Sequence, residues 1–335
     1  MNAPQTEALA RRLAALPDVI LRRDAPLAEL CWFRIGGPAA LVAEPASLPG
    51  AARLFAALGE AGVRPLVIGD GSNLLFDDAG YDGVVLRIGR ALSRIAVDGA
   101  EMRVDCGAWT PRVALAAQRA GLSGIEHVIG IPGAFGGLVA MNGGSRRESV
   151  GTHLLEVEHV GPDGEIRVVP HDACGFSYRA SAFQARDGAI LRARLRLVPG
   201  DRDAIRAEMR GIMAARRAKF PLKLPNCGSV FLSTRELFET IGPPGRAIEE
   251  AGLRGRARGA ARIAPIHGNF IVNEGGARAA DVLGLIALAR GAVRARTGIA
   301  MDAEVRFVHA DGRIEPAHLE AERRFPREAA GEDRG

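Results

Sequence analysis

The feature that most constrains this chain is a glycine-rich stretch at residues 124–144, with Gly130, Gly133, Gly136 and Gly137 near its centre. Glycine adopts positive φ and lets a ligand contact the backbone, but it costs conformational entropy. A chain that accepts this cost repeatedly in one place commonly presents bare backbone N–H groups to an anion. The alternative interpretation is a tight surface loop without a ligand.

A second glycine loop follows a short apolar run and contains Gly69, Gly71, Ser72 and Asn73. It differs from the dinucleotide-binding pattern G-x-G-x-x-G, because the third glycine is replaced by Leu74 and no helical pattern follows. Two glycines would allow an anion to approach closely, and the serine and asparagine side chains would add donors. The sequence pattern is equally compatible with a plain turn at the end of a strand.

Composition excludes several classes of function. The net charge is +5, but the basic residues are almost all arginines scattered through alanine-rich segments, which disfavours nucleic-acid binding. The four cysteines are far apart, so neither a zinc site nor a disulfide framework is indicated, and we expect no metal. No apolar run reaches the length of about 18 residues that a membrane span needs. We expect a cytoplasmic monomer without membrane or nucleic-acid partners.

Hydrophobic periodicity predicts alternating helices and strands. Helices are expected at 5–16, 47–62, 110–120, 201–219 and 277–297, with Thr110 as the N-cap of the third. Strands are expected at 64–68, 84–88, 93–97, 101–106, 154–160, 165–169, 189–198, 269–273 and 303–308. At 335 residues, two or three domains are expected.

Three single residues are candidates for chemistry. Arg179 lies in an aromatic-framed stretch and could bind a carboxylate through both arms of its guanidinium. Glu304 interrupts an apolar strand, so it is either a salt-bridge partner or a site residue, because an inward carboxylate is costly when unpaired. Ser229 follows Gly228 in a turn, where a serine is most often a turn hydroxyl. The histidines show no metal-ligand spacing, which favours structural or solvated roles.

Seven short motifs together resemble the UDP-N-acetylenolpyruvoylglucosamine reductases, the MurB family. The motifs occur in family order between about residue 30 and residue 308. They are Phe33-Arg34 with Gly36-Gly37, residues 69–75, residues 130–142, Tyr178-Arg179 with Ser181, Gly228 to Phe231, His267 to Asn273, and Glu304-Val305. Each motif is weak alone, and the ordered set is specific.

The resemblance implies an α+β fold: a vanillyl-alcohol-oxidase-type FAD-binding fold of two α+β subdomains, plus a smaller α+β substrate-binding domain. We expect an N-terminal helix at 1–25, the FAD domain at 26–200 with subdomains at about 26–90 and 91–200, and the substrate domain at 201–310. The charged residues 311–335 are expected to be a frayed tail.

The same resemblance implies a function. Members reduce UDP-N-acetyl-3-O-(1-carboxyvinyl)glucosamine to UDP-N-acetylmuramate in peptidoglycan synthesis, with non-covalent FAD and NADPH. It assigns catalysis to Arg179, Ser229 and Glu304, with Ser229 as proton donor, and substrate binding to Tyr178 and Asn269. It assigns FAD binding to Arg34, Gly69, Gly71, Ser72, Asn73, Leu74, Gly130, Ile131, Pro132, Gly133, Gly136, Gly137 and Asn142.

The chain departs from the family pattern at Cys31-Trp32 and at Leu232-Ser233-Thr234. Its only tyrosines are Tyr81 and Tyr178, which is typical of the second subtype, lacking a tyrosine-bearing loop. Two other functions stay open. One is a related FAD-dependent sugar or alcohol oxidoreductase, and the other is a non-catalytic paralogue that binds a nucleotide sugar.

Overall fold

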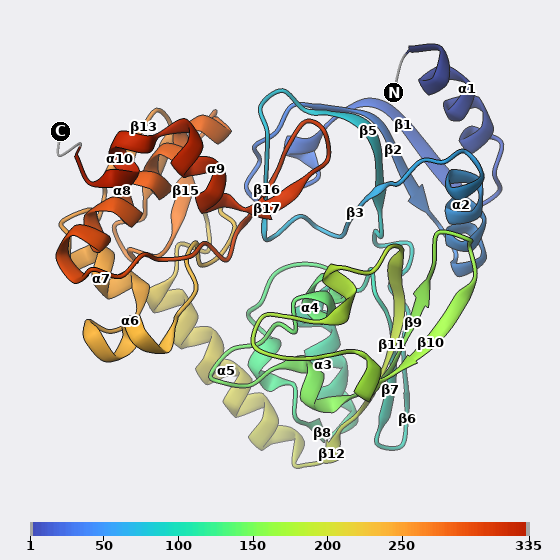
Figure 1. Cartoon of the computed structure of the whole chain (residues 1–335). Helices are drawn as coiled ribbons and strands as arrows, with labels where there is room; N and C mark the ends of the chain where they lie inside the picture. Colours follow the sequence, from blue (N-terminus) through green and yellow to red (C-terminus); the bar gives the residue numbers. More distant parts are fainter. Residues whose placement is uncertain (1–2, 333–335) are drawn as a thin grey trace. The chain divides into compact units, whose positions relative to one another are not determined.

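The computed structural model describes residues 3–332, which form two compact units (Figure 1). Unit 1 comprises the chain up to Asp24, Ala40–Asp70 and Gly83–Arg216, and unit 2 comprises Ala25–Ala39, Gly71–Asp82 and the chain from Arg217 onward. The chain therefore passes between the units several times, and two short N-terminal segments belong to unit 2.

The first layer of unit 1 is a four-stranded sheet in the order β1 (Val19–Pro26), β2 (Pro38–Pro45), β5 (Tyr81–Arg87) and β3 (Leu66–Ile68). Helices α1 (Ala3–Ala14) and α2 (Leu48–Glu60) bury apolar side chains against this sheet in one core cluster. Helix α2 begins close to the predicted position. Ser47 is its N-cap, since the Ser47 side chain accepts a hydrogen bond from Gly50 N at 3.0 Å.

The second layer of unit 1 is a five-stranded antiparallel sheet (Figure 1). Its order is β10 (Ile166–Pro170), β9 (Leu154–Val160), β11 (Ala189–Arg196), β7 (Glu101–Asp105) and β6 (Ile95–Asp98). Helices α3 (Thr110–Ala120), α4 (Phe135–Ala140) and α5 (Arg202–Lys219) contribute to the same core cluster as its buried face. A short pair, β8 (Leu122–Ser123) and β12 (Val198–Pro199), joins α3 to the chain before α5.

Strand β11 has one buried face and one polar face. Ala193 and Leu195 are buried, whereas Arg192 and Arg194 project from the other face. Arg192 Nε lies 2.7 Å from Asp105 Oδ1, and Arg194 Nη2 lies 2.8 Å from Glu156 Oε2. Alternation along the strand therefore separates core from ion pairs.

Unit 2 contains two three-stranded sheets. The first has the order β17 (Ile314–Pro316), β16 (Arg306–Val308) and β4 (Leu74–Phe76), and β4 runs parallel to β16. The second has the order β13 (Ala257–Arg258), β14 (Ala261–Ile263) and β15 (Ile271–Asn273). The helices are α6 (Arg235–Thr240), α7 (Pro244–Glu250), α8 (Ala279–Thr297), α9 (Ala317–Arg324) and α10 (Pro326–Ala330).

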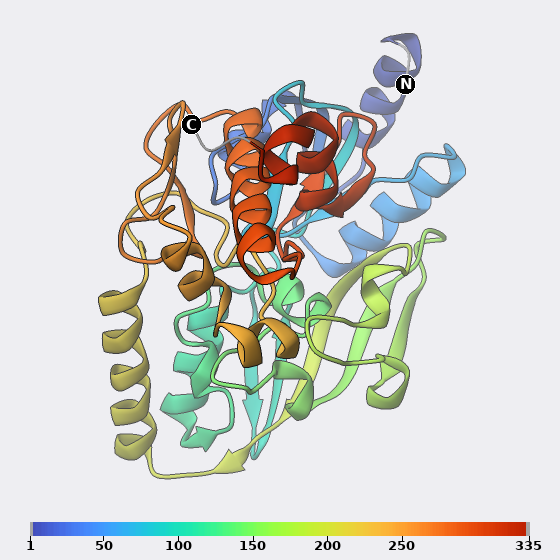
Figure 2. The same cartoon turned by 60° about the vertical axis from the view of Figure 1, so that its left-hand side comes forward.

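The expectation of a frayed segment from residue 311 is wrong for 311–332, and residues 333–335 lie outside the described part. That segment forms β17, α9 and α10, and both helices pack on α8 (Figure 2). Arg294 of α8 donates to the Ala329 carbonyl at 3.0 Å. The high charge of the segment suggested disorder, but its charges are used in ion pairs.

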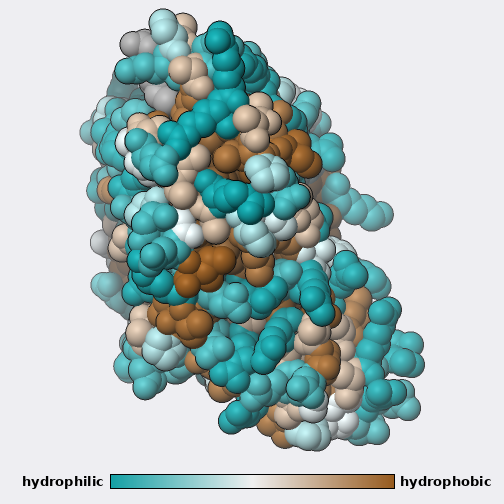
Figure 3. Space-filling model, turned by 90° about the vertical axis from the view of Figure 1, so that its right-hand side faces the viewer, coloured by the Kyte–Doolittle hydropathy of each residue, from teal (hydrophilic) through white to brown (hydrophobic). Residues whose placement is uncertain are grey.

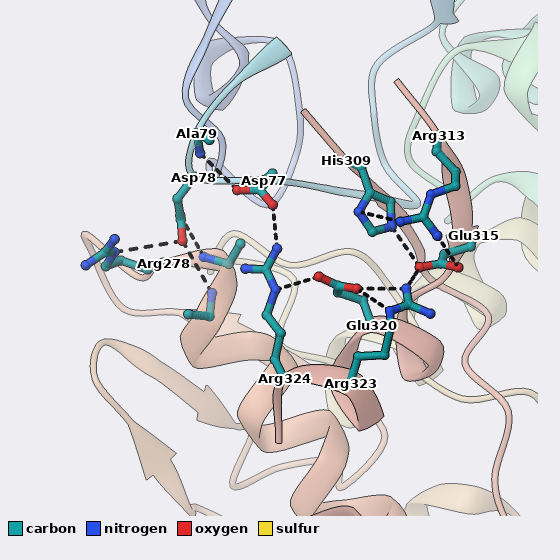
Figure 4. Close-up of polar contacts among 12 residues, drawn as sticks. Asp77, Asp78, Ala79, Arg278, His309, Arg313, Glu315, Glu320, Arg323 and Arg324 are labelled. Carbon is teal, nitrogen blue, oxygen red and sulfur yellow. Dashed lines mark hydrogen bonds and ion pairs between the residues drawn. The ribbon is translucent and has the colours of Figure 1, made fainter. Parts of the chain in front are cut away.

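These ion pairs tie α9 to the strands of the first sheet of unit 2 (Figure 4). Arg324 contacts Asp77 and Glu320 at 2.6 Å each, and His309 Nε2 lies 2.7 Å from Glu315 Oε1. The group His309, Glu315 and Glu320 is close enough to hold a metal ion, but Arg323 and Arg324 engage its carboxylates, as does Arg313. Those arginines oppose a cation, so we interpret the cluster as a structural ion-pair network.

Hydrophilic side chains cover much of the face shown in Figure 3, with apolar areas between them. Among the helices of residues 3–332, none is both long enough and apolar enough to cross a membrane.

Candidate functional site

The glycine-rich loop before α4 is held by backbone contacts within unit 1. Phe135 N donates to the Ala108 carbonyl and Gly136 N to the Cys106 carbonyl, each at 2.8 Å. A Cβ on Gly136 would lie only 2.9 Å from Cys106 Cβ. This close approach of two segments therefore explains the glycine at position 136.

Thr110 has a different role from the predicted N-cap. Trp109 occupies the N-cap position of α3, and both the backbone N and the Oγ1 of Thr110 donate to the Gly133 carbonyl at 3.0 Å. Gly133 has φ +122°, a conformation that side chains rarely adopt. The start of α3 thus fixes the direction of the glycine loop.

Within unit 1, Gly69 approaches the glycine-rich stretch closely. A Cβ on Gly69 would lie 2.8 Å from Ala134 Cβ, so a side chain at position 69 would push Ala134 away. Asp70 is buried here, and its carboxylate lies 2.5 Å from Arg90 Nη2 and 3.8 Å from Arg87 Nη2. These arginines offset a negative charge that would otherwise repel an anion from the loops.

Each glycine loop contains backbone N–H groups that make no hydrogen bond within the described residues. Among the described residues, the N–H groups of Gly71, Ser72, Asn73, Gly133 and Ala134 donate no hydrogen bond. Backbone N–H groups are normally satisfied, so a glycine loop whose N–H groups donate no hydrogen bond is suited to bind an anion. The donors of each loop therefore fit the diphosphate of FAD, and their assignment to it stays a prediction.

The side chain of Asn73 has a partner within unit 2. Its Nδ2 donates to the Glu304 carbonyl at 3.1 Å, and its own carbonyl accepts from Arg306 N at 3.0 Å. The amide group therefore binds the backbone of the segment before β16, and the assignment of Asn73 to FAD binding stays a prediction. Asn73 links the second glycine loop to the segment that carries Glu304.

The other predicted FAD residues of unit 2 lie near these strands. Leu74 begins β4, and Arg34 is exposed with a left-handed backbone, φ +55°. Asn273 Nδ2 donates to the Phe33 carbonyl at 3.0 Å and to the Arg34 carbonyl at 3.3 Å, which secures that conformation. Sequence reasoning missed this role of Asn273.

Arg179 lies in unit 1, in a tight turn between Ser177 and Ala180. The backbone N of each end donates to the carbonyl of the other, at 3.0 and 3.2 Å. Arg179 has φ +55°, and its Nη2 donates to the Gly144 carbonyl at 3.0 Å. Its guanidinium carbon lies 5.3 Å from the centre of the Tyr178 ring. One arm of the guanidinium is therefore oriented by the glycine-rich stretch.

His127 binds Ser145, the residue that follows Gly144 at the end of the glycine-rich stretch. It is buried, its Nδ1 accepts from Ser145 N at 3.4 Å, and its carbonyl accepts from Ser145 Oγ at 2.5 Å. Burial, aided by the charges of His153 and Arg179, lowers the pKa of His127 to about 4. His127 thus stays neutral near neutral pH. Its role is structural, one of the two roles that the sequence analysis favoured for the histidines.

Ser229 and Glu304 lie in unit 2, on segments that pair with each other. Glu304 N donates to the Val230 carbonyl at 2.8 Å, and Leu232 N donates to the Asp302 carbonyl at 2.9 Å. Gly228 has φ +81°, and no atom lies within 4 Å of the position that a Cβ there would take. The serine hydroxyl and the carboxylate therefore come from neighbouring backbone segments, as a shared site requires.

Asn142 and Asn269 are buried and use their side chains internally. Asn142 bonds to Ser177 and Gly151, and Asn269 bonds to Phe231 through both of its polar atoms. These internal contacts give both residues a structural role, and the FAD-binding role of Asn142 and the substrate-binding role of Asn269 stay predictions. Tyr178 is 64% exposed, and its assignment to substrate binding stays a prediction.

Two protein-family models match separate parts of the chain. Residues 39–169 match the FAD binding domain, and residues 220–308 match the C-terminal domain of UDP-N-acetylenolpyruvoylglucosamine reductase. The first contains the whole second glycine loop and all of the glycine-rich stretch. The second contains Ser229 and Glu304.

Similar proteins cover nearly the whole chain. UDP-N-acetylenolpyruvoylglucosamine reductase 1 of Corynebacterium glutamicum is 40% identical over 309 residues, 92% of each chain. The reductase of Heliobacterium modesticaldum is 39% identical over 292 residues, 86% of this chain and 90% of that one. The crystal structure of MurB from Thermus caldophilus has a TM-score of 0.72 at 31% identity, covering 86% of this chain and 98% of that one. The chain therefore belongs to the UDP-N-acetylenolpyruvoylglucosamine reductase family, MurB.

Proposed function

We propose that this chain reduces the enolpyruvyl ether of UDP-N-acetylglucosamine to the lactyl ether of UDP-N-acetylmuramate, a step in peptidoglycan synthesis. The observation that carries the proposal is the match to named reductases across 92% of the chain, with both the FAD-binding and the C-terminal domain present. FAD, when bound, supplies the chemistry of accepting a hydride from NADPH and delivering it from N5 to C3 of the substrate.

Arg179 is suited to bind the substrate carboxylate. Hydride addition at C3 places negative charge on C2 and on its carboxylate, and a guanidinium stabilises that charge where it develops. The Gly144 carbonyl holds one arm of the guanidinium, so the remaining N–H groups have a defined direction. A preoriented cation needs little reorganisation during the reaction.

Ser229 is assigned to deliver a proton to C2. A neutral hydroxyl can protonate a basic carbanion when water is excluded. Glu304 is assigned to orient or polarise the same assembly, since its backbone N binds the Val230 carbonyl next to Ser229. The N–H groups of the glycine loops are assigned to hold the FAD diphosphate.

The test measures the two half-reactions separately, by following the absorbance of the flavin in stopped-flow experiments. In Ser229→Ala, reduction of the flavin by NADPH should stay near the wild-type rate. Reoxidation by the enolpyruvyl substrate should slow by about 10²–10⁴-fold, because no positioned acid remains. Equal slowing of both steps would make Ser229 structural. If the substrate does not reoxidise the wild-type flavin at all, the proposed function is wrong.

The nature of the flavin link distinguishes the alternative oxidases. We propose that FAD is non-covalent, since residues 69–75 and 130–137 contain no histidine or cysteine to which it could be attached. Acid precipitation should release all the colour to the supernatant, and colour in the pellet would favour a covalent oxidase. A non-catalytic paralogue would bind the UDP sugar without reoxidising the flavin. The cytoplasmic location, the monomeric state and the second subtype stay predictions.

A further inference from the structure

We propose that Asn142 and Asn269 are positioning residues of the reaction, Asn142 for Arg179 and Asn269 for Ser229. The proposal rests on the proposed function, and it goes beyond it by naming the groups that hold the catalytic side chains. Both asparagines are almost fully buried, at 4% and 5% exposure.

Asn269 forms a three-point contact with the segment that follows Ser229. Its Nδ2 donates to the Phe231 carbonyl at 2.9 Å, and its Oδ1 accepts from Phe231 N at 2.8 Å. Its own carbonyl accepts from Val230 N at 2.9 Å. The amide side chain thus satisfies both backbone groups of one residue, as a neighbouring strand would. Only one residue, Val230, separates the clamped Phe231 from Ser229.

The opposite side of this segment faces the residues before β16. Phe231 bridges Ala303, and Leu232 N donates to the Asp302 carbonyl. The backbone after Ser229 is therefore held between Asn269 and the Glu304 segment. Gly228, which precedes Ser229, has φ +81° and no close neighbour at the Cβ position. Asn269 thus holds the backbone after Ser229, while Gly228 N donates to Asn226 Oδ1 at 2.9 Å on the other side.

Asn142 performs the same task for Arg179 in unit 1. Its Nδ2 donates to the Ser177 carbonyl at 2.8 Å. Ser177 is the first residue of the turn that carries Arg179. Its Oδ1 accepts from Gly151 N at 3.0 Å. Asn142 itself has φ +41°, a region that asparagine, aspartate and glycine tolerate. The side chain therefore joins the end of the glycine-rich stretch to the Arg179 turn.

Single-atom variants isolate these contacts. Asn269→Asp and Asn142→Asp keep the shape and the accepting oxygen but remove the N–H donor to Phe231 or Ser177. Misplacing a catalytic group by about 1 Å can cost about 10²-fold in rate. Asn269→Asp should slow reoxidation by the enolpyruvyl substrate about 10²-fold and leave reduction by NADPH within about twofold of wild type. Asn142→Asp should act mainly through weaker binding of the substrate in the same step.

The two asparagines serve as matched controls for each other in double-mutant cycles. If Asn269 acts through Ser229, Asn269→Asp should add no further slowing in a Ser229→Ala protein and its full slowing in an Arg179→Ala protein. Asn142→Asp should show the reverse pattern. Residues that act as one unit are non-additive in this way.

Three outcomes would overturn the inference. They are additive effects in every pair, equal slowing of both half-reactions, and wild-type kinetics in the aspartate variants. If an aspartate variant does not retain flavin, Asn269→Ser and Asn142→Gly repeat the cycles, and additivity there has the same meaning. Failure of the wild-type protein to be reoxidised by the substrate would refute the proposed function instead, which keeps the two failures distinct.

Discussion

Several residues of the proposed site hold a backbone conformation that costs free energy. Arg34, Asn142 and Arg179 have φ of +55°, +41° and +55°, although none is a glycine. Such conformations cost of order 1–3 kcal/mol each and persist where the surroundings enforce them, often at functional sites. Here the enforcing contacts come from Asn273, from the Asn142 side chain itself and from the turn at Ser177.

At Arg179, charge alone should not suffice. Arg179→Ala should slow flavin reoxidation strongly, and Arg179→Lys should restore little of the rate, because an ammonium cannot reproduce a two-armed contact with a carboxylate while also reaching Gly144. Stopped-flow rates of the second half-reaction measure both. Arg235→Lys, at an exposed helical position, is the matched control and should change nothing. Equal activity of lysine and arginine at position 179 would mean that the residue supplies only charge.

Sequence reasoning did not foresee the internal contacts of three asparagines. Asn73, Asn142 and Asn269 lie in motifs that predict ligand binding, and an amide can donate to a phosphate as well as to a carbonyl. Which partner it takes depends on backbone segments far away in the chain, such as Glu304 for Asn73. Local pattern carries no information on that choice.

At the scale of elements, the periodic segments were predicted well and the charged ones were not. The hairpin of β9 and β10 and the helices α2, α3, α5 and α8 occur where hydrophobic periodicity placed them, within a few residues. The C-terminal helices α9 and α10 were missed, because their charges pair with residues outside the segment, such as Asp77. The spacing of apolar residues indicates which side chains are buried, but it carries no information about ion pairs with distant strands.

The glycine loops should tolerate no side chain. In Gly71→Val, the new Cβ would lie 2.7 Å from Cys31 Cβ at φ +58°, and in Gly133→Val a branched residue would be forced to φ +122°. We expect loss of flavin retention, read from the absorbance ratio of the purified protein. Gly211→Ala is the control, because that α5 position has open space and should keep its flavin. Full flavin in both valine variants would refute the phosphate-loop assignment.

Across the whole molecule, buried histidines link stability to pH. Burial lowers the pKa of both His127 and His159 to about 4, whereas an unfolded histidine titrates near 6.5. Between these values the unfolded chain binds more protons than the folded one. Stability is therefore greatest above the unfolded pKa and falls as the pH drops from about 6.5 to about 4.

His159 allows this linkage to be measured away from the site. Its share of the stability lost between about pH 7 and about pH 5 is about 2 kcal/mol, if its pKa is about 4 in the folded state. In His159→Gln, the loss between these two pH values should shrink by about that amount in urea unfolding of the flavin-loaded protein. An unchanged difference would mean that His159 titrates normally.

The parallel pairing of β4 with β16 also sets the order in which the protein can be completed during synthesis. Leu74 to Phe76 emerge from the ribosome early, yet their strand partners are residues 306–308. The segment Ala25–Ala39 likewise belongs to a unit whose other residues begin at Gly71 and end at the C-terminus. A nascent chain therefore carries an unpaired β4, directly after the second glycine loop, until residues 306–308 have been synthesised. We expect cofactor capture to be a post-translational event, and ribosome-stalled chains that end before residue 306 to lack flavin.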